Sequence, residues 1–200
     1  MSRTLIQLNL ATRPHHAEAD QHWLDLMAPS VNRERYEALL VLVYGFEAPL
    51  DSAFRYTPGL SSLVELRGRT RTGLLAQDLM RLGLTASQIA QLPQRFTTFS
   101  SAAEALGWMY VFERATLVHG STRRHLLQRM PDLTCATSYL EAYDSITSLR
   151  WGELGSALDA VATTPSVTRQ LIRAATDGFR AMRDWFHAVA APWIKQPIAT

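Results

Sequence analysis

The sequence predicts an all-α fold, a single domain built as a multi-helical bundle of about six to eight helices. Apolar residues recur at the three-to-four spacing of a helix in each long segment of the chain. No stretch alternates with period two for long enough to build a sheet. The 200 residues are 47% hydrophobic, with no break in composition, so one ample core is expected. We place the domain at residues 1–192 and a flexible tail at residues 193–200.

Charge and cysteine content narrow the class of protein. The net charge at pH 7 is only +2 and the arginines are scattered, which argues against a nucleic-acid surface. The single cysteine, Cys135, excludes an intrachain disulfide and a multi-cysteine metal site, and we interpret it as a buried or spectator thiol. The chain shows neither a secretory signal nor an apolar run of about 18 residues, so we expect a cytoplasmic protein without a membrane segment.

The first helical segment runs from about Leu5 to Ala28 and is interrupted at Pro14, which disfavours a helical conformation at Arg13. We expect a kink there, or a helix that starts near Thr12, whose side chain suits a helix start. The expected core contacts of this segment are Leu8, Ala11, Trp23, Leu24 and Met27. The next segment, Val31 to Phe54, contains the continuous apolar run ALLVLVYGF and predicts a buried helix.

Proline and glycine punctuate the middle of the chain. After a turn at residues 56–59, leucines at helical spacing predict a helix from Ser61 to Leu82, which Gly83 ends. Thr85 to Leu92 predicts one short capped helix. A basic strip in this region, interpreted as a solvated face, comprises Arg67, Arg69 and Arg71.

The segment from Leu106 to Leu126 is the longest in which an apolar helical face, a row of unusual polar residues and a late glycine coincide. Ser100 or Ser101 followed by Glu104 predicts the cap that starts it. The polar residues on or beside its apolar stripe are Arg114, His119, Arg123 and Arg124. Because an ordinary core helix would have more leucine at these positions, we expect the middle of this helix to face a site.

Two more helices complete the predicted bundle. The segment from Tyr139 to Val161 is amphipathic. Thr164 and Pro165 start a last helix with a long apolar face, and Pro192 is expected to end it.

His16 is the residue of the N-terminal segment that is best placed for chemistry. On a continuous helix Arg13, His16 and Asp20 would share one face, with a cation one turn before the imidazole and a carboxylate one turn after it. That arrangement suits an axial metal ligand, but it also describes solvated polar residues on an amphipathic helix. His119 and His125 are six residues apart and do not share a helical face. No HExxH, GxSxG or phosphate-binding glycine loop is present.

Four segments, in the right order along the chain, resemble those of the haem oxygenases. Thr12, His16 and Asp20 match the opening helix of that family, which has a threonine, a histidine four residues on and an acidic residue four after that. Residues 77–84 are similar to its DLxxLG stretch, and residues 106–113, reading LGWMYVFE, are similar to its LGxxYVxE segment, followed by a matching Arg-His-Leu. Thr164-Pro-Ser-Val resembles the start of its last long helix.

The resemblance implies a haem-oxygenase-like bundle of a divergent bacterial type, with haem b held between a proximal helix and a kinked distal helix. His16 would ligate the iron, Arg13 would meet a propionate, and Asp20 and Tyr110 would belong to the haem-binding site. The family converts haem to biliverdin, carbon monoxide and ferrous iron with dioxygen and electrons from an external ferredoxin or reductase. A bilin-using photoreceptor is a candidate partner.

The sequence departs from the family on the distal helix. Arg114, Val118 and His119 stand where the family has glycines, and Ala115 replaces a polar residue that helps order distal water in some members. Three outcomes follow. Arg114 turns toward a propionate and the protein is a haem oxygenase; His119 ligates the iron and the protein is a haem carrier or sensor; or side chains fill the pocket and the fold is a scaffold for another ligand or partner.

Overall fold

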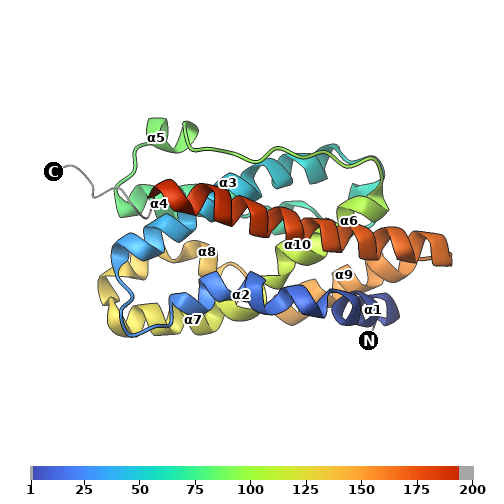
Figure 1. The fold of residues 1–200 in the computed structure, drawn as a ribbon, viewed down its shortest axis with the longest axis horizontal. Helices are drawn as coiled ribbons and strands as arrows, with labels where there is room; N and C mark the ends of the chain where they lie inside the picture. The colour runs from blue at the N-terminus through green and yellow to red at the C-terminus, as the bar shows by residue number, and fades with distance from the viewer. Residues whose placement is uncertain (1, 194–200) are drawn as a thin grey trace.

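The computed structural model describes residues 2–193 and contains helices but no strand in that range, which confirms the all-α prediction (Figure 1). The α-helices are α1 Arg3–Thr12, α2 His16–Asp25, α3 Arg33–Tyr56, α4 Thr72–Leu82, α5 Ala86–Ala90, α6 Ala102–Arg114, α7 Thr116–Arg129, α8 Ser138–Glu141, α9 Thr147–Val161 and α10 Pro165–Trp193. The 3₁₀ turns are η1 Arg13–His15, η2 Leu60–Ser62, η3 Arg67–Arg69 and η4 Pro131–Ala136. None of the helices within residues 2–193 is long and apolar enough to cross a membrane.

The helix α10 runs along most of the length of the molecule and packs most extensively against α6 (Figure 1). The helix α1 lies beside α9, and the backbone N–H of Thr4 donates to the carboxylate of Asp159 at 2.9 Å. The helix α2 lies beside α7. Buried apolar residues form two clusters: one joins α6, α9 and α10 to the second half of α3, and the other joins α2, α4, α7 and α8 to the first half of α3.

The predicted break at Pro14 is confirmed, because the turn η1 separates α1 from α2. Thr12 does not cap α2; its hydroxyl donates back to the carbonyl of Leu8 at 2.7 Å. Among the expected core contacts, Leu8 and Trp23 are buried, Met27 is half-buried, and Ala11 and Leu24 are exposed. The prediction was wrong for Ala11 and for Leu24. For Leu24 the reason is η1, because a 3₁₀ turn has three residues per turn and shifts the buried face of the helix that follows.

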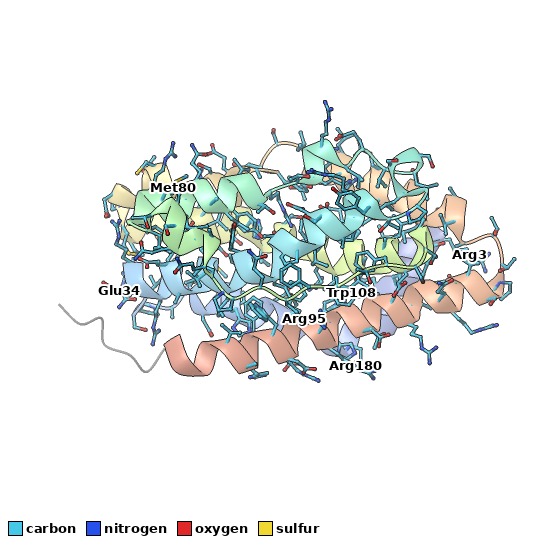
Figure 2. The ribbon with its side chains drawn as sticks, turned by 90° about the horizontal axis from the view of Figure 1, so that it is seen from above. Arg3, Glu34, Met80, Arg95, Trp108 and Arg180 are labelled. Atoms are coloured by element: carbon cyan, nitrogen blue, oxygen red, sulfur yellow. The ribbon has the colours of Figure 1, made fainter. Side chains whose placement is uncertain are left out.

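The helix α3 continues through Pro49, which has no N–H to donate to the carbonyl of Gly45 one turn earlier. The N–H of Arg95 donates to that free carbonyl at 2.8 Å. A Cβ at Gly45 would lie 2.3 Å from the carbonyl oxygen of Pro93, so glycine is needed for the segment after α5 to lie against α3. Figure 2 shows Arg95 next to Trp108 of α6, and the guanidinium carbon lies 5.5 Å from the ring centroid. The contact secures α6 to this segment.

The basic strip is mostly buried, so its interpretation as a solvated face was wrong for two of its three arginines. Arg69 and Arg71 are 2% and 1% exposed. Arg71 donates to Glu47 at 3.3 Å and to the backbone carbonyl of Phe112 at 2.9 Å. Arg69 donates to Glu113 at 2.8 Å. Burial raises the pKa of Glu47 to about 7, and its contact with Arg71 opposes that rise.

Two predicted helices are shorter than expected. The segment from Ser61 to Leu82 begins with the turns η2 and η3, and its α-helix starts at Thr72, because the buried arginines of this region point inward to carboxylates of other helices. The segment from Tyr139 to Val161 is divided into α8 and α9 by a turn. Cys135 lies on η4 and is exposed, so the interpretation as a buried thiol is wrong and the spectator thiol stays a prediction.

The predicted helix starts and stops are confirmed where local chemistry determines them. Gly83 ends α4 with φ of 119°, and Thr85 forms a capping box with Gln88 at the start of α5. The hydroxyl of Ser101 accepts from the N–H of Glu104 at the start of α6. The helix α10 starts at Pro165 as predicted and extends one residue beyond Pro192, within the usual uncertainty of a helix boundary. Apart from its first residue, the expected tail lies outside the described residues.

Candidate functional site

The predicted distal helix is divided at Ala115 into α6 and α7. The hydroxyl of Thr116 donates to the carbonyl of Glu113 at 2.6 Å, and the N–H of Val118 bonds to the carbonyl of Ala115, three residues earlier. A threonine hydroxyl that bonds a nearby carbonyl competes with the helical hydrogen bond at that point. The predicted helix is therefore interrupted at Ala115, in the region where the resemblance implies a kink.

Thr12, His16 and Tyr110 meet at the start of α2. The Nε2 atom of His16 lies 3.0 Å from the hydroxyl of Thr12 and 3.3 Å from the hydroxyl of Tyr110. Tyr110 is fully buried on α6, whereas His16 is half-buried. Burial and then the charge of Arg114 lower the pKa of His16, so its imidazole is neutral near pH 7. The ring nitrogen that could ligate a metal therefore has protein partners already.

Arg114 and Asp20 form an ion pair between the end of α6 and α2. Their side chains are 13% and 18% exposed. The Nε atom of Arg114 is buried and has no hydrogen-bond partner among the described residues. Arg114 is therefore directed toward the helix that carries His16.

His119 lies further along α7 and packs on aromatic side chains. Its ring centroid is 4.7 Å from that of Trp23 on α2 and 4.9 Å from that of Tyr139 on α8. Burial, with a smaller contribution from Arg71, lowers the pKa of His119 well below its ordinary value. Its Nε2 atom has no hydrogen-bond partner within residues 2–193. His119 is therefore a neutral core histidine whose ring faces Trp23.

The other predicted site residues contribute less. Arg13 is exposed on η1, and the single helical face predicted for Arg13, His16 and Asp20 is interrupted by that turn. Ala115 and Val118 are half-buried and pack against the second apolar cluster. No group of three or more His, Cys, Asp or Glu side chains within the described residues is suited to hold a metal ion.

The space between α2 and the α6–α7 pair is occupied by side chains of the chain itself. The Arg114–Asp20 ion pair crosses it at one level, and the contact between Trp23 and His119 crosses it at another. A separate hollow between α2 and α10, beside His15 and Phe179, has a volume of only about 10 Å³, enough for one water molecule at most. The residues present therefore do not fit a haem at His16 in this structure.

Comparison with known proteins identifies the family. The family model described as "Heme oxygenase" matches residues 2–188, so the chain belongs to the haem oxygenase family. The crystal structure of the NO- and CO-bound haem oxygenase from Neisseria meningitidis has the same fold, with a TM-score of 0.70 and 21% sequence identity, covering 96% of this chain and 95% of that chain. No curated protein sequence matches this chain.

Sequence reasoning selected Asp20, Arg114 and His119 but did not pair them correctly. Asp20 and Arg114 are 94 residues apart, and no local pattern links them. Trp23 was expected in the core but not at the site. The sequence did contain a signal for Trp23. It follows His16 by about two helical turns, which places both residues on the same surface of α2.

Proposed function

We propose that this chain is a non-catalytic member of the haem oxygenase family, in which the fold serves as a scaffold for another ligand or partner. The observation that carries the proposal is that side chains cross the space where the family resemblance would put haem: Arg114 pairs with Asp20, and Trp23 packs against His119. Arg114 stands at a position where the resemblance implies glycine, so a side chain occupies space that bare backbone would leave open.

The expected free energies indicate that haem would be excluded mainly because side chains fill its space, and less because of the charges of Arg114 and Asp20. A partly exposed ion pair contributes about 1 kcal/mol or less, whereas micromolar affinity for a ligand corresponds to about 8 kcal/mol. The ion pair alone would therefore not exclude haem. Trp23, which is 4% exposed, would also have to leave His119, and exposing a buried large apolar side chain to water costs about 1.5–3 kcal/mol. Together these costs would weaken haem binding by roughly two to three orders of magnitude.

Haem oxygenase activity is the second candidate function, supported by the family match and by the meeting of Thr12, His16 and Tyr110. In that case haem b would be both cofactor and substrate, His16 and Arg13 would bind it, and an external ferredoxin or reductase would supply electrons. A haem carrier that uses His119 as a distal ligand has less support, because the ring of His119 is packed between Trp23 and Tyr139.

A hemin titration tests the proposal. Purified protein is mixed with micromolar hemin while the Soret band is followed, and ascorbate or a ferredoxin system is then added while biliverdin absorbance is recorded. We expect no saturable Soret shift for the wild type. Arg114→Gly/Val118→Gly should gain affinity, whereas the matched variant Arg123→Gly, at an arginine that pairs with the exposed Glu141, should behave as the wild type.

Other results would select another function. Tight wild-type binding followed by biliverdin formation would establish haem oxygenase activity and overturn the proposal. A tight wild-type complex without biliverdin would overturn the proposal that side chains fill the pocket, and it would identify a haem carrier or sensor. His16→Ala then reports the axial ligand, because loss of the native spectrum would assign it to His16.

A further inference from the structure

A second hollow lies between α7 and the turn that joins α8 to α9. Its volume is about 280 Å³, near the lower end of ligand pockets, which start at roughly 300 Å³. Thr116, Gly120 and Arg124 form its α7 wall and are spaced by one helical turn each. Tyr143 and Asp144 belong to the opposite wall. None of these residues belongs to the His16 site described above.

Two opposite charges meet in this hollow without pairing. A Cβ placed on Gly120 would lie 3.1 Å from Oδ1 of Asp144 and 3.7 Å from Nη1 of Arg124, so both charged groups converge on the same point of α7. Neither side chain makes an ion pair with the other or with any other residue in the part of the chain that the structure describes. Neighbouring Arg123, in contrast, is paired with Glu141.

The polar groups around these charges are arranged to accept hydrogen bonds. The hydroxyls of Ser121 and Thr147 each donate to a backbone carbonyl, at 2.9 and 2.6 Å, which leaves oxygen lone pairs free. The hydroxyl of Thr116 also donates to a carbonyl, but it already accepts from the indole N–H of Trp151 at 3.4 Å. His119 also belongs to the lining, but it is 3% exposed and its ring packs on Trp23 and Tyr139, so it offers no acceptor to the hollow. The hollow therefore offers acceptors for N–H groups and one guanidinium for an anionic group.

We propose that this hollow binds a small zwitterion of the α-amino-acid class, with the carboxylate on Arg124 and the ammonium on Asp144. A simple anion would meet the carboxylate of Asp144, and a simple cation would meet the guanidinium of Arg124. A ligand that carries both charges satisfies both groups at once. The hydroxyl group of Thr147 is then available to the side chain of the ligand, which favours a polar one.

The test is an NMR titration of the ¹⁵N-labelled full chain with L-glutamine as the probe. We expect saturable shifts of the backbone amides of Gly120, Arg124 and Asp144. N-acetyl-L-glutamine lacks the ammonium and L-glutamine amide lacks the carboxylate, so each should bind on the order of tenfold more weakly, the change for one lost charge-assisted contact.

Variants identify the contacts. Arg124→Gln should weaken L-glutamine on the order of tenfold but leave the affinity for L-glutamine amide unchanged, because that probe has no carboxylate. Asp144→Asn should show the converse pattern with the acetylated probe. The matched control Arg123→Gln should bind L-glutamine as the wild type does. Arg124 and Asp144 are exposed, and thermal unfolding of each variant checks that it is folded.

Three results would overturn the proposal. These are an absence of saturable shifts up to roughly 10 mM L-glutamine, equal binding of the blocked probes, or unchanged binding by Arg124→Gln. The outcome does not depend on the hemin titration, since a chain that binds haem could still bind a zwitterion in this hollow. Failure here therefore leaves the proposed function standing.

Discussion

The helices α6 and α7 are consecutive halves of one predicted helix, and they differ in almost every physical respect. Ten of the residues of α6, Ala103 and residues 105–113, are buried, and α6 packs along α10. Only Thr116, His119, Thr122 and Leu126 are buried on α7, which lies between the filled space at α2 and the hollow at Asp144. The difference indicates that α6 stabilises the fold through its buried length, whereas α7 carries Val118 and His119, two of the three positions where the resemblance implies glycine.

The largest expected effect is the loss of unfolding free energy when the buried ion pair between Arg71 and Glu47, next to α6, is broken. Arg71→Met leaves Glu47 buried without its cation, and breaking such a pair costs about 3–5 kcal/mol of unfolding free energy. Urea denaturation measures the change, with Arg67→Met at an exposed position as the matched control. A loss for Arg71→Met no larger than for the control would show that α6 does not depend on this pair.

The second prediction concerns the close packing of α6 on α10. A Cβ at Gly107 would lie 2.7 Å from both Cβ of Ala174 and the carbonyl oxygen of Leu171. Gly107→Ala should therefore separate the two helices and cost about 1–3 kcal/mol. Gly73→Ala, where an added Cβ meets nothing within 4 Å, should instead leave stability unchanged or raise it by about 0.5–1 kcal/mol. Similar effects of the two substitutions in urea denaturation would contradict the tight contact.

The third prediction uses the pH dependence of stability to test whether His119 of α7 is buried and neutral. Burial and Arg71 lower the pKa of His119, so the folded protein keeps it neutral while the unfolded chain protonates it below about pH 6.5. Because the unfolded state then binds more protons, stability falls as the pH falls, by up to about 1.4 kcal/mol per pH unit for this residue. His119→Phe should remove that contribution. Parallel stability curves for wild type and variant between pH 6.5 and 5 would show that His119 is not a neutral buried residue.

The smallest expected loss of unfolding free energy comes from breaking the ion pair between Arg114 and Asp20, which crosses the space beside α2. Asp20→Asn removes the partner of Arg114, but because both side chains retain some exposure we expect a cost of about 1 kcal/mol or less. Glu18→Gln, on the same helix but in a more exposed contact with His187, should cost still less. A loss of several kcal/mol for Asp20→Asn in the same measurement would contradict this prediction, because the pair would then stabilise the fold as strongly as the buried ion pair next to α6.

Local chemistry made most of the fold predictable from the sequence. The cap at Ser101, the stop at Gly83 and the start at Pro165 depend on residues within one turn, so the pattern alone identifies them. The family resemblance singled out Thr12 and His16, which the structure brings into contact. These features need no knowledge of distant partners.

Pairings across the chain could not be predicted in the same way. The sequence pattern gives Arg71 the appearance of a surface residue, because its partner Glu47 lies on another helix. The contact of Trp23 with His119 depends on how α2 is rotated after η1, which no local rule determines. The same limit applies to the meeting of Arg124 and Asp144 at Gly120.

The hydrogen bond from Thr4 to Asp159 has a consequence for how the protein is made. The two groups are 155 residues apart, so α1 has no docking partner there until α9 has been synthesised. Chains leave the ribosome at roughly 5–20 residues per second, and contacts between distant residues form late. The helix α1 therefore stays without these partners until α9 and α10 have emerged, whereas α2, which carries His16 and Asp20, can already lie against α7.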